Sequence, residues 1–394
     1  MSAAAESLQS LDASPAFAGV ERVQPLAMRR VPLDQWDAMA ADFDGLCQEQ
    51  MLAFAGVRWS GATPEATVFE SNGRVIGGCL VVVQRLPLGV GHIAMSKWGP
   101  MLADATQPDA MATYASMVEA MVAEYSARRG MLLSILNLPS VNGPNAENTY
   151  LLERGFTPGV LLNYPLRYLV NLQPGMDEIR KGFEQKWRYQ LNKSMKSGEL
   201  SFEHGAADRL GDFTDLYERM LDRKRFADFS AYETVPHLMA VDNPQGRPEL
   251  FFVRQGGELV AGAIVFKGGD RAVYLYGATT DQALPLRAGY FLHWHIIGWL
   301  KENTKARWYD LGGTDGFLGL HQFKKGMVGS HGVISPVPRV MNYADNRFAY
   351  LVGNAALWAR EGCQEVLRRL SRLRKDRAQP TMPRYIEKPE DARF

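Results

Sequence analysis

Residues 307–329 combine a carboxylate, paired glycines and two adjacent cations. The aromatic and aliphatic run at 308–311 predicts a short buried strand, because it stops abruptly at a glycine pair. Asp310 would then lie at a strand end, beside backbone that can approach a ligand closely. Lys324 follows an aromatic residue further along, and an ammonium fixed there would stabilise negative charge on a reacting oxygen. A surface lysine after an ordinary turn is the competing interpretation.

Two tyrosines add hydroxyl groups to this set. Tyr274 and Tyr276 lie in a stretch, residues 272–277, whose aromatic and β-branched content predicts a strand. Residues two apart share one face of a strand, so we expect both rings to face one ligand. Tyr276 is assigned to the catalytic group and Tyr274 to the substrate-binding group. Half-buried packing within the sheet is the alternative.

A predicted helix over residues 177–197 carries an apolar stripe, and cations crowd the rest of its surface. Such a surface could follow the phosphates of a tRNA, a nucleotide-linked precursor or CoA. A solvated charged face is the alternative. The expected substrate-binding cations are Lys186, Arg188, Lys193 and Lys196 on this helix, Arg225 in a second small cluster, and Arg287 at the start of a predicted long helix.

Composition limits the classes of protein to which this chain could belong. Its 394 residues predict two domains, and 46% hydrophobic with 22% charged residues is typical of a globular protein. A net charge of +1 excludes a protein that is basic throughout, so any nucleic-acid contact must be local. The three cysteines lack CxxC spacing, which argues against a disulfide framework or a zinc site. They fit a reducing cytoplasm, which is the expected location.

No metal site is expected. His293 and His295 are the residues that suggest one, but side chains two apart on a predicted helix point to different faces. Packing histidines are therefore the better interpretation.

The elements that must position these residues recur in the same order in both halves of the chain. Strands, a long helix, a strand, a short helix and a closing strand are predicted in each half. We therefore expect an α/β fold with mixed α+β sheets, built as two tandem copies of one unit. The expected divisions are a disordered leader at 1–19, an N-terminal domain at 20–170, a C-terminal catalytic domain at 171–345, and an amphipathic helix and tail at 346–394.

The two ends of the chain and its apolar runs indicate how the protein could relate to a membrane. Residues 1–19 lack the charged and apolar regions of a signal peptide, and no apolar run is long enough to span a bilayer. Residues 347–375 predict an amphipathic basic helix. We expect it to dock on the second domain, and the alternative is that it lies on the inner face of an anionic membrane as a peripheral contact.

Five pieces of the second half resemble the Fem-type transferases, the FemABX or FemAB-like group. These enzymes build amino-acid cross-bridges on peptidoglycan precursors and consist of two tandem acyl-CoA N-acyltransferase (GNAT) folds. The first half matches in outline only, at residues 97–100 and 152–156. The five pieces occur in the family's order at residues 186–198, 274–279, 291–301, 309–313 and 319–326.

The resemblance implies two tandem GNAT-like domains and an acyltransferase (aminoacyltransferase or N-acyltransferase) without a nucleophilic serine or cysteine. It places Lys324 where the family carries its functional lysine, and it leaves open whether Asp310 acts as a base, holds the acceptor or shapes the site. The implied function is tRNA-dependent aminoacyl transfer to an amine of a peptidoglycan precursor in the cell envelope. No tightly bound cofactor is implied, and the co-substrate would be aminoacyl-tRNA or acyl-CoA.

Two other functions remain open at this point. An acyl-CoA-dependent N-acyltransferase could act on an amino-lipid, such as a sphingoid base, or on a polysaccharide amine. Ordinary GNAT enzymes hold the CoA pyrophosphate in a glycine-rich loop, of which only Gly289 is present here, and Pro285 removes one N–H donor. A non-catalytic protein that binds envelope components is the third hypothesis. The sequence does not choose the donor, the acceptor amine or the oligomeric state.

Overall fold

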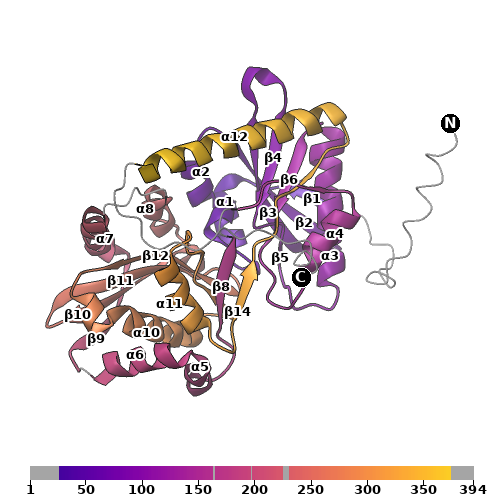
Figure 1. Cartoon of the computed structure of the whole chain (residues 1–394). Helices are drawn as coiled ribbons and strands as arrows, with labels where there is room; N and C mark the ends of the chain where they lie inside the picture. The colour runs from indigo at the N-terminus through magenta and orange to yellow at the C-terminus, as the bar shows by residue number, and fades with distance from the viewer. Residues whose placement is uncertain (1–25, 163–164, 197, 225–229, 374–394) are drawn as a thin grey trace, which may run out of the picture.

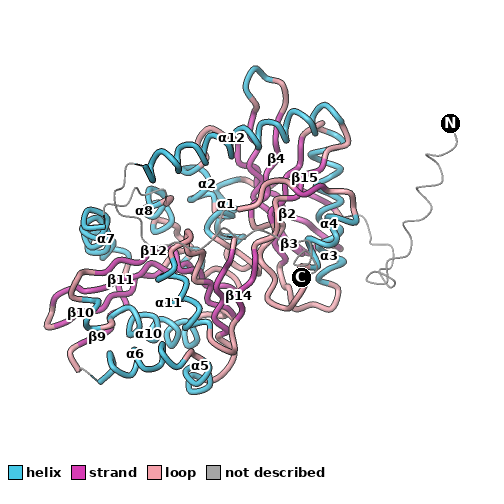
Figure 2. Tube along the Cα trace, viewed as in Figure 1, coloured by secondary structure: helices cyan, strands magenta, loops and turns pink. Residues whose placement is uncertain are grey.

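The computed structural model describes residues 26–162, 165–196, 198–224 and 230–373. Figure 1 shows two α/β units, and Figure 2 shows that in each the strands lie between helices. This arrangement confirms the expected α/β fold class with mixed sheets in two units. The expected leader at 1–19 lies outside the described residues.

The first unit is built around a mixed sheet with the strand order β1-β2-β3-β4-β6-β15-β7, from which β5 branches at β3. Helix α3 packs its apolar face, including Tyr114, Met117 and Met121, on this sheet, and seven π-helical residues at 122–128 extend it. The elements are β1 (Ala27–Arg30), α1 (Leu33–Ala40), α2 (Leu52–Arg58), β2 (Thr63–Ser71), β3 (Arg74–Arg85), β4 (His92–Lys97), β5 (Met101–Leu102), α3 (Ala110–Met121), β6 (Leu132–Leu136), α4 (Ala146–Glu153) and β7 (Thr157–Pro158).

The second unit repeats this plan with the strand order β14-β8-β13-β12-β11-β10-β9. Helices α6 and α10 cover one face of its sheet and α7 covers the other. The elements are α5 (Met176–Gly182), α6 (Gln185–Lys196), β9 (Leu200–Gly205), α7 (Leu210–Lys224), α8 (Val235–Met239), β10 (Glu249–Gln255), β11 (Glu258–Phe266), β12 (Arg271–Thr279), α9 (Ala283–Leu286), α10 (Ala288–Asn303), β13 (Trp308–Asp310), α11 (Leu318–Val328) and β14 (Val333–Pro336).

The single helix expected over 177–197 is two helices. Phe183 takes an extended conformation, with φ −57° and ψ 150°, and this ends α5. Its ring is buried against Trp187, so the break is held by core packing. A sequence pattern of mixed apolar and basic residues does not reveal such a break, because both helices bury the same stripe.

The two units exchange one strand each. Strand β8 (Leu166–Asn171) was expected to close the first unit, yet it pairs with β13 and β14 in the second sheet. Strand β15 (Met341–Tyr343) returns to the first sheet, where it pairs with β6 and β7. Each sheet is therefore completed by a strand from the other half of the chain. The domain boundary at residue 170 stays a prediction, and the exchanged strands pair across it.

The sixteen-residue helix α10 leads into β13, the strand that carries Asp310. Strands β12 and β13 run parallel, but they pair only between residues 271–273 and 308–310. The equivalent strands of the first unit, β4 and β6, stay paired through residues 93–97 and 132–136. In the second sheet, β12 thus continues past Val273 without β13 beside it.

The C-terminal helix α12 (Arg347–Leu373) docks on the first sheet. Its Tyr350 and Leu357 join a cluster with Ile93 and Leu132 of that sheet. The expectation that it docks on the second domain is therefore wrong, because β15 has already carried the chain back to the first unit. None of the described helices is long and apolar enough to cross a membrane.

Candidate active site

Lys324 is buried where β12 and β13 part. It projects from α11 with 5% of its surface exposed, and its Nζ donates to the backbone oxygens of Leu311 and Gly313, at 2.5 Å each. The preceding Phe323 packs against Trp187 and Tyr290, which fixes the helix turn that carries the lysine. The ammonium is thus held at the end of β13.

The charge on Lys324 is sensitive to pH near neutrality. Burial and, to a lesser degree, the nearby Arg167 guanidinium lower the pKa of this ammonium, while Asp315 and Asp310 oppose the shift, and the net pKa is about 8. A lysine with this pKa is still mainly charged at pH 7. An ammonium has three donors, and two are used by the carbonyls, which leaves one for a reacting oxygen.

Asp310 is fully buried and already has partners. Its carboxylate accepts from Nε of Arg167 at 3.1 and 3.2 Å, from Nη2 of Arg167 at 2.9 Å, and from the backbone N–H of Gly312 at 2.8 Å. Gly312 takes φ +74°, a conformation that favours glycine. The contacts of Asp310 are those of a group that positions the glycine turn under Lys324.

Arg167 connects this site to the first unit. Its guanidinium lies over the ring of Trp98, at 5.7 Å from the centroid, and Trp98 holds φ 62° in the left-handed region. Next to it, Lys97 pairs with buried Glu49 at 3.0 Å. Burial raises the pKa of Glu49, but the Lys97 ammonium, a hydrogen bond from Trp98 and the Arg167 charge together bring it below its usual value. The candidate site is therefore built from both halves of the chain.

Sequence reasoning missed Arg167 and Glu49 as members of the site. Arg167 lies on β8, which was assigned to the first unit, and only the strand exchange brings it to Asp310. The one available signal was Lys97 with Trp98, part of the outline match in the first half.

The two tyrosines of β12 lie on opposite faces of the sheet, so the expectation that they share one face is wrong. Tyr274 packs against His293 of α10, and the Nζ of Lys324 is 5.8 Å from its ring centroid. Tyr276 packs against Tyr217 and Tyr232, in the cluster on the α7 side. The pairing register shifts between these tyrosines, and this bulge reverses the alternation of side chains.

His293 belongs to the packing around Lys324. Its Nδ1 lies 3.1 Å from the hydroxyl of Tyr309, and burial lowers its pKa to about 3, assisted by the Lys324 charge. The ring is therefore neutral at physiological pH. Within the described ranges, no three His, Cys, Asp or Glu side chains gather as a metal-binding group.

The predicted phosphate-binding cations divide into two groups. Lys186, Lys193 and Lys196 are exposed on α6. In contrast, Arg188 donates to the carbonyls of Lys181 and Phe183 at the end of α5, and Arg287 donates to Gln190 and to the Pro285 carbonyl. Arg225 lies outside the described residues.

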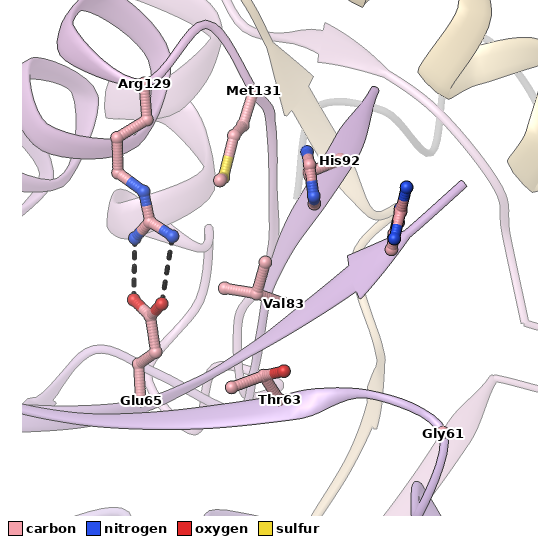
Figure 3. A pocket seen from close by; sticks show the side chains of 8 residues that line it. Gly61, Thr63, Glu65, Val83, His92, Arg129 and Met131 are labelled. Carbon is pink, nitrogen blue, oxygen red and sulfur yellow. Dashed lines mark hydrogen bonds and ion pairs between the residues drawn. The ribbon is translucent and has the colours of Figure 1, made fainter. Parts of the chain in front are cut away.

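A pocket of about 330 Å³ opens in the first unit, away from Lys324. Figure 3 shows the Glu65 carboxylate paired with Arg129 inside it, at 2.7 and 2.9 Å. Its lining comes from strands of the first sheet and the turn before β6, and the paired charges cancel. It does not contribute to the site around Lys324.

Comparisons with known proteins support the expected fold. Residues 181–325 match the family model of the acetyltransferase (GNAT) domain, a range that includes Lys324. The structure is similar to that of FemX, with a TM-score of 0.66 and 15% identity over 83% of this chain and 100% of FemX. A conserved protein of unknown function from Bacteroides thetaiotaomicron is also similar, with a TM-score of 0.52 and 12% identity over 80% of this chain and 99% of that one. No curated protein matches the sequence. At these identities the structural likeness shows the fold alone, and it confirms the expected resemblance at that level.

Proposed function

From the premise that the chain is an acyltransferase with a GNAT domain in a FemX-like fold, we propose that it is a Fem-like N-acyltransferase. It would move an aminoacyl group from a tRNA to an amine of a peptidoglycan precursor. It would work in the cytoplasm, and it would need no tightly bound cofactor because the donor brings an activated ester.

The observation that carries this proposal is the buried Lys324 ammonium at the parting of β12 and β13. In the reaction, the acceptor amine forms a bond to the acyl carbon, the ester bond to the ribose breaks, and the amine proton passes to the departing ribose oxygen. Negative charge develops first on the carbonyl oxygen and then on the leaving oxygen. The free donor of Lys324 could stabilise either, and Asp310 would act by holding the turn that accepts the other two donors.

The start of α10 favours tRNA over CoA as the donor. The residues before it form the short helix α9, where a phosphate-binding loop would need open backbone N–H groups. Pro285 has no N–H, and the Arg287 guanidinium is turned back on the Pro285 carbonyl and Gln190. The exposed Lys186, Lys193 and Lys196 would instead contact phosphates of a tRNA or of a nucleotide-linked acceptor.

A second candidate has one observation in its favour. The matched family is described as an acetyltransferase (GNAT) domain, and GNAT domains use acyl-CoA. An acyl-CoA-dependent transfer to an amino-lipid or a polysaccharide amine would use the same Lys324 chemistry. The two candidates differ in the donor and in the acceptor.

The test is to offer the purified chain both donors separately. Aminoacyl-tRNA with a nucleotide-linked or lipid-linked peptidoglycan precursor should give a product heavier by one aminoacyl residue in mass spectrometry, whereas acyl-CoA with the same acceptor should give none. Product from acyl-CoA and a lipid amine would replace the first proposal with the second. No product from any pair, together with tight binding of a precursor, would favour the non-catalytic hypothesis.

A further inference from the structure

Helix α12 carries apolar residues on two opposite faces. One face packs on the first sheet through Tyr350 and Leu357, and Gly353 approaches so closely that an added Cβ would lie 2.6 Å from the Leu132 side chain. The opposite face carries Phe348, Leu351, Trp358 and Val366, which are 60%, 66%, 60% and 56% exposed. Their spacing of three, seven and eight residues places them in one stripe along the helix.

A second element adds apolar side chains beside this stripe. The hairpin between β3 and β4 carries Leu88, which is 99% exposed at φ 58°, and Val90, which is 41% exposed. The base of the hairpin, Leu86 and Ile93, packs in the same cluster as α12. Figure 1 shows its loop projecting past α12 at the top of the molecule. The hairpin tip and the helix stripe thus protrude together from the first unit.

Positive charge borders these apolar side chains. Arg347 and Arg360 on α12 and Arg85 at the hairpin are exposed. The sequence of α12 from 360 to 373 contains four arginine residues and two acidic ones. A helix with apolar side chains facing outward and arginines beside them is the pattern of peptides that lie in the interface of anionic membranes.

The charge around the stripe argues against a second copy of the chain as the occupant. Two copies that paired through this surface would bring exposed arginines such as Arg347 and Arg360 together, and like charges across an interface are unfavourable. A stripe with a protruding leucine beside it also fits a deformable lipid surface better than a rigid protein partner.

We propose that the outer stripe of α12 and the tip of the β3–β4 hairpin form a membrane-contact surface that holds the chain on an anionic lipid bilayer. The apolar side chains enter the headgroup region, and the arginines contact lipid phosphates. This inference goes beyond the proposed function and does not depend on the donor or the acceptor.

The test is cosedimentation of the full chain with vesicles. Wild-type protein should pellet with phosphatidylglycerol-containing vesicles, and much less with pure phosphatidylcholine vesicles. The variant Leu351→Glu/Trp358→Glu should bind at least about tenfold more weakly, because it places two charges in the stripe. Leu88→Glu, on a separate element, should also weaken binding. Leu33→Glu/Leu152→Glu makes the same charge change on exposed leucines elsewhere and should bind like wild type.

Thermal unfolding of each variant separates lost binding from lost folding, and all of these residues are exposed. Brominated lipids should quench wild-type tryptophan fluorescence more strongly than that of Trp358→Phe. The proposal is overturned if wild type fails to bind anionic vesicles, or if both stripe and hairpin variants bind as wild type does. A third outcome also overturns it: the wild type forms a dimer and does not bind vesicles, and the Leu351→Glu/Trp358→Glu variant is a monomer. Activity in solution with a free acceptor should be unchanged in all these variants, so this test and that of the acyl transfer can fail separately.

Discussion

Two hydrogen bonds determine how Lys324 can act. Its Nζ is held by the carbonyls of Leu311 and Gly313, so the ammonium cannot swing toward a substrate as a surface lysine would. A fixed charge does not have to reorganise during the reaction, which is the condition for strong electrostatic stabilisation of a transition state. The residue following it, Lys325, is exposed and reaches Glu184 only at 4.0 Å.

Replacing Lys324 with methionine should therefore lower kcat more than it raises KM. The change keeps the apolar stem and deletes the charge, and removal of one such donor commonly reduces the rate about 100-fold to 1000-fold. Lys325→Met is the matched control and should stay within a few-fold of wild type. Steady-state kinetics of the two variants give the answer, and equal losses in both would exclude the proposed role of Lys324.

The pH dependence should report the same group. Because burial lowers the pKa of Lys324 to about 8, kcat should fall as the pH rises through that value, well below the 10.5 of an ordinary lysine. In Lys324→Arg, where the charge persists at high pH, this decline should be absent even if the rate is lower. A profile that is flat from pH 7 to 10 in the wild type would contradict the assignment.

The free energy of unfolding should rise with pH between about pH 8 and 10.5, whereas kcat falls. Between about pH 8 and 10.5 the unfolded lysine binds more protons than the folded one, so the free energy of unfolding should rise with pH, by up to about 1.4 kcal/mol per unit. Denaturant unfolding of Lys324→Met should lack this rise.

At the scale of elements, the second unit differs from the first in two irregular features. The bulge in β12 turns Tyr274 and Tyr276 to opposite faces, and the short pairing of β12 with β13 leaves their ends apart. The first unit keeps its equivalent strands fully paired. This asymmetry supports the proposal that the chemistry lies in the second unit, although both units have the same plan.

Helix α6 carries exposed lysines proposed to bind substrate phosphates and an arginine, Arg188, that holds the end of α5. The double variant Lys186→Gln/Lys193→Gln should raise the KM for a phosphate-bearing substrate and make this KM less dependent on salt concentration. With fewer phosphate contacts, fewer counterions are released when the substrate binds. Thermal stability should be unchanged, since both side chains are exposed. Arg188→Gln should behave differently: it removes the bonds to the carbonyls that end α5, so the melting temperature should fall. An unchanged salt dependence in the lysine variant would assign those lysines to a solvated face.

At the scale of the whole molecule, the exchange of β8 and β15 ties the two units together. Cutting the chain after residue 172 should therefore give two fragments that do not fold separately. The first fragment would lack β15 and carry β8 without its partners, and the second would lack β8 and carry β15 without its partners. Coexpressed fragments should assemble and recover activity. Two independently soluble, cooperatively unfolding halves would show that the exchanged strands contribute little.

The sequence by itself determined the order of elements, the repeat, and the place of Lys324 after a strand, glycine pair and aromatic residue. These follow from local patterns, since side-chain periodicity and glycine turns depend on neighbouring residues. The sequence did not distinguish phosphate-binding cations from structural ones, because Arg188 and Lys186 are both basic residues at neighbouring positions of one predicted helix. Only their contacts distinguish a guanidinium that binds backbone carbonyls from an ammonium in solvent.

The tertiary structure alone decided which residues meet at the site. Arg167 and Asp310 are 143 positions apart and pair because β8 crosses into the second sheet. The bulge that separates Tyr274 from Tyr276 depends on pairing with β11, and the docking of α12 depends on the return of β15 to the first sheet. The strand exchange and the docking of α12 join segments far apart in the sequence, and the bulge depends on the register of β12 against β11. Their free energies depend on the partner element as well as on the local residues, so a local pattern does not reveal them.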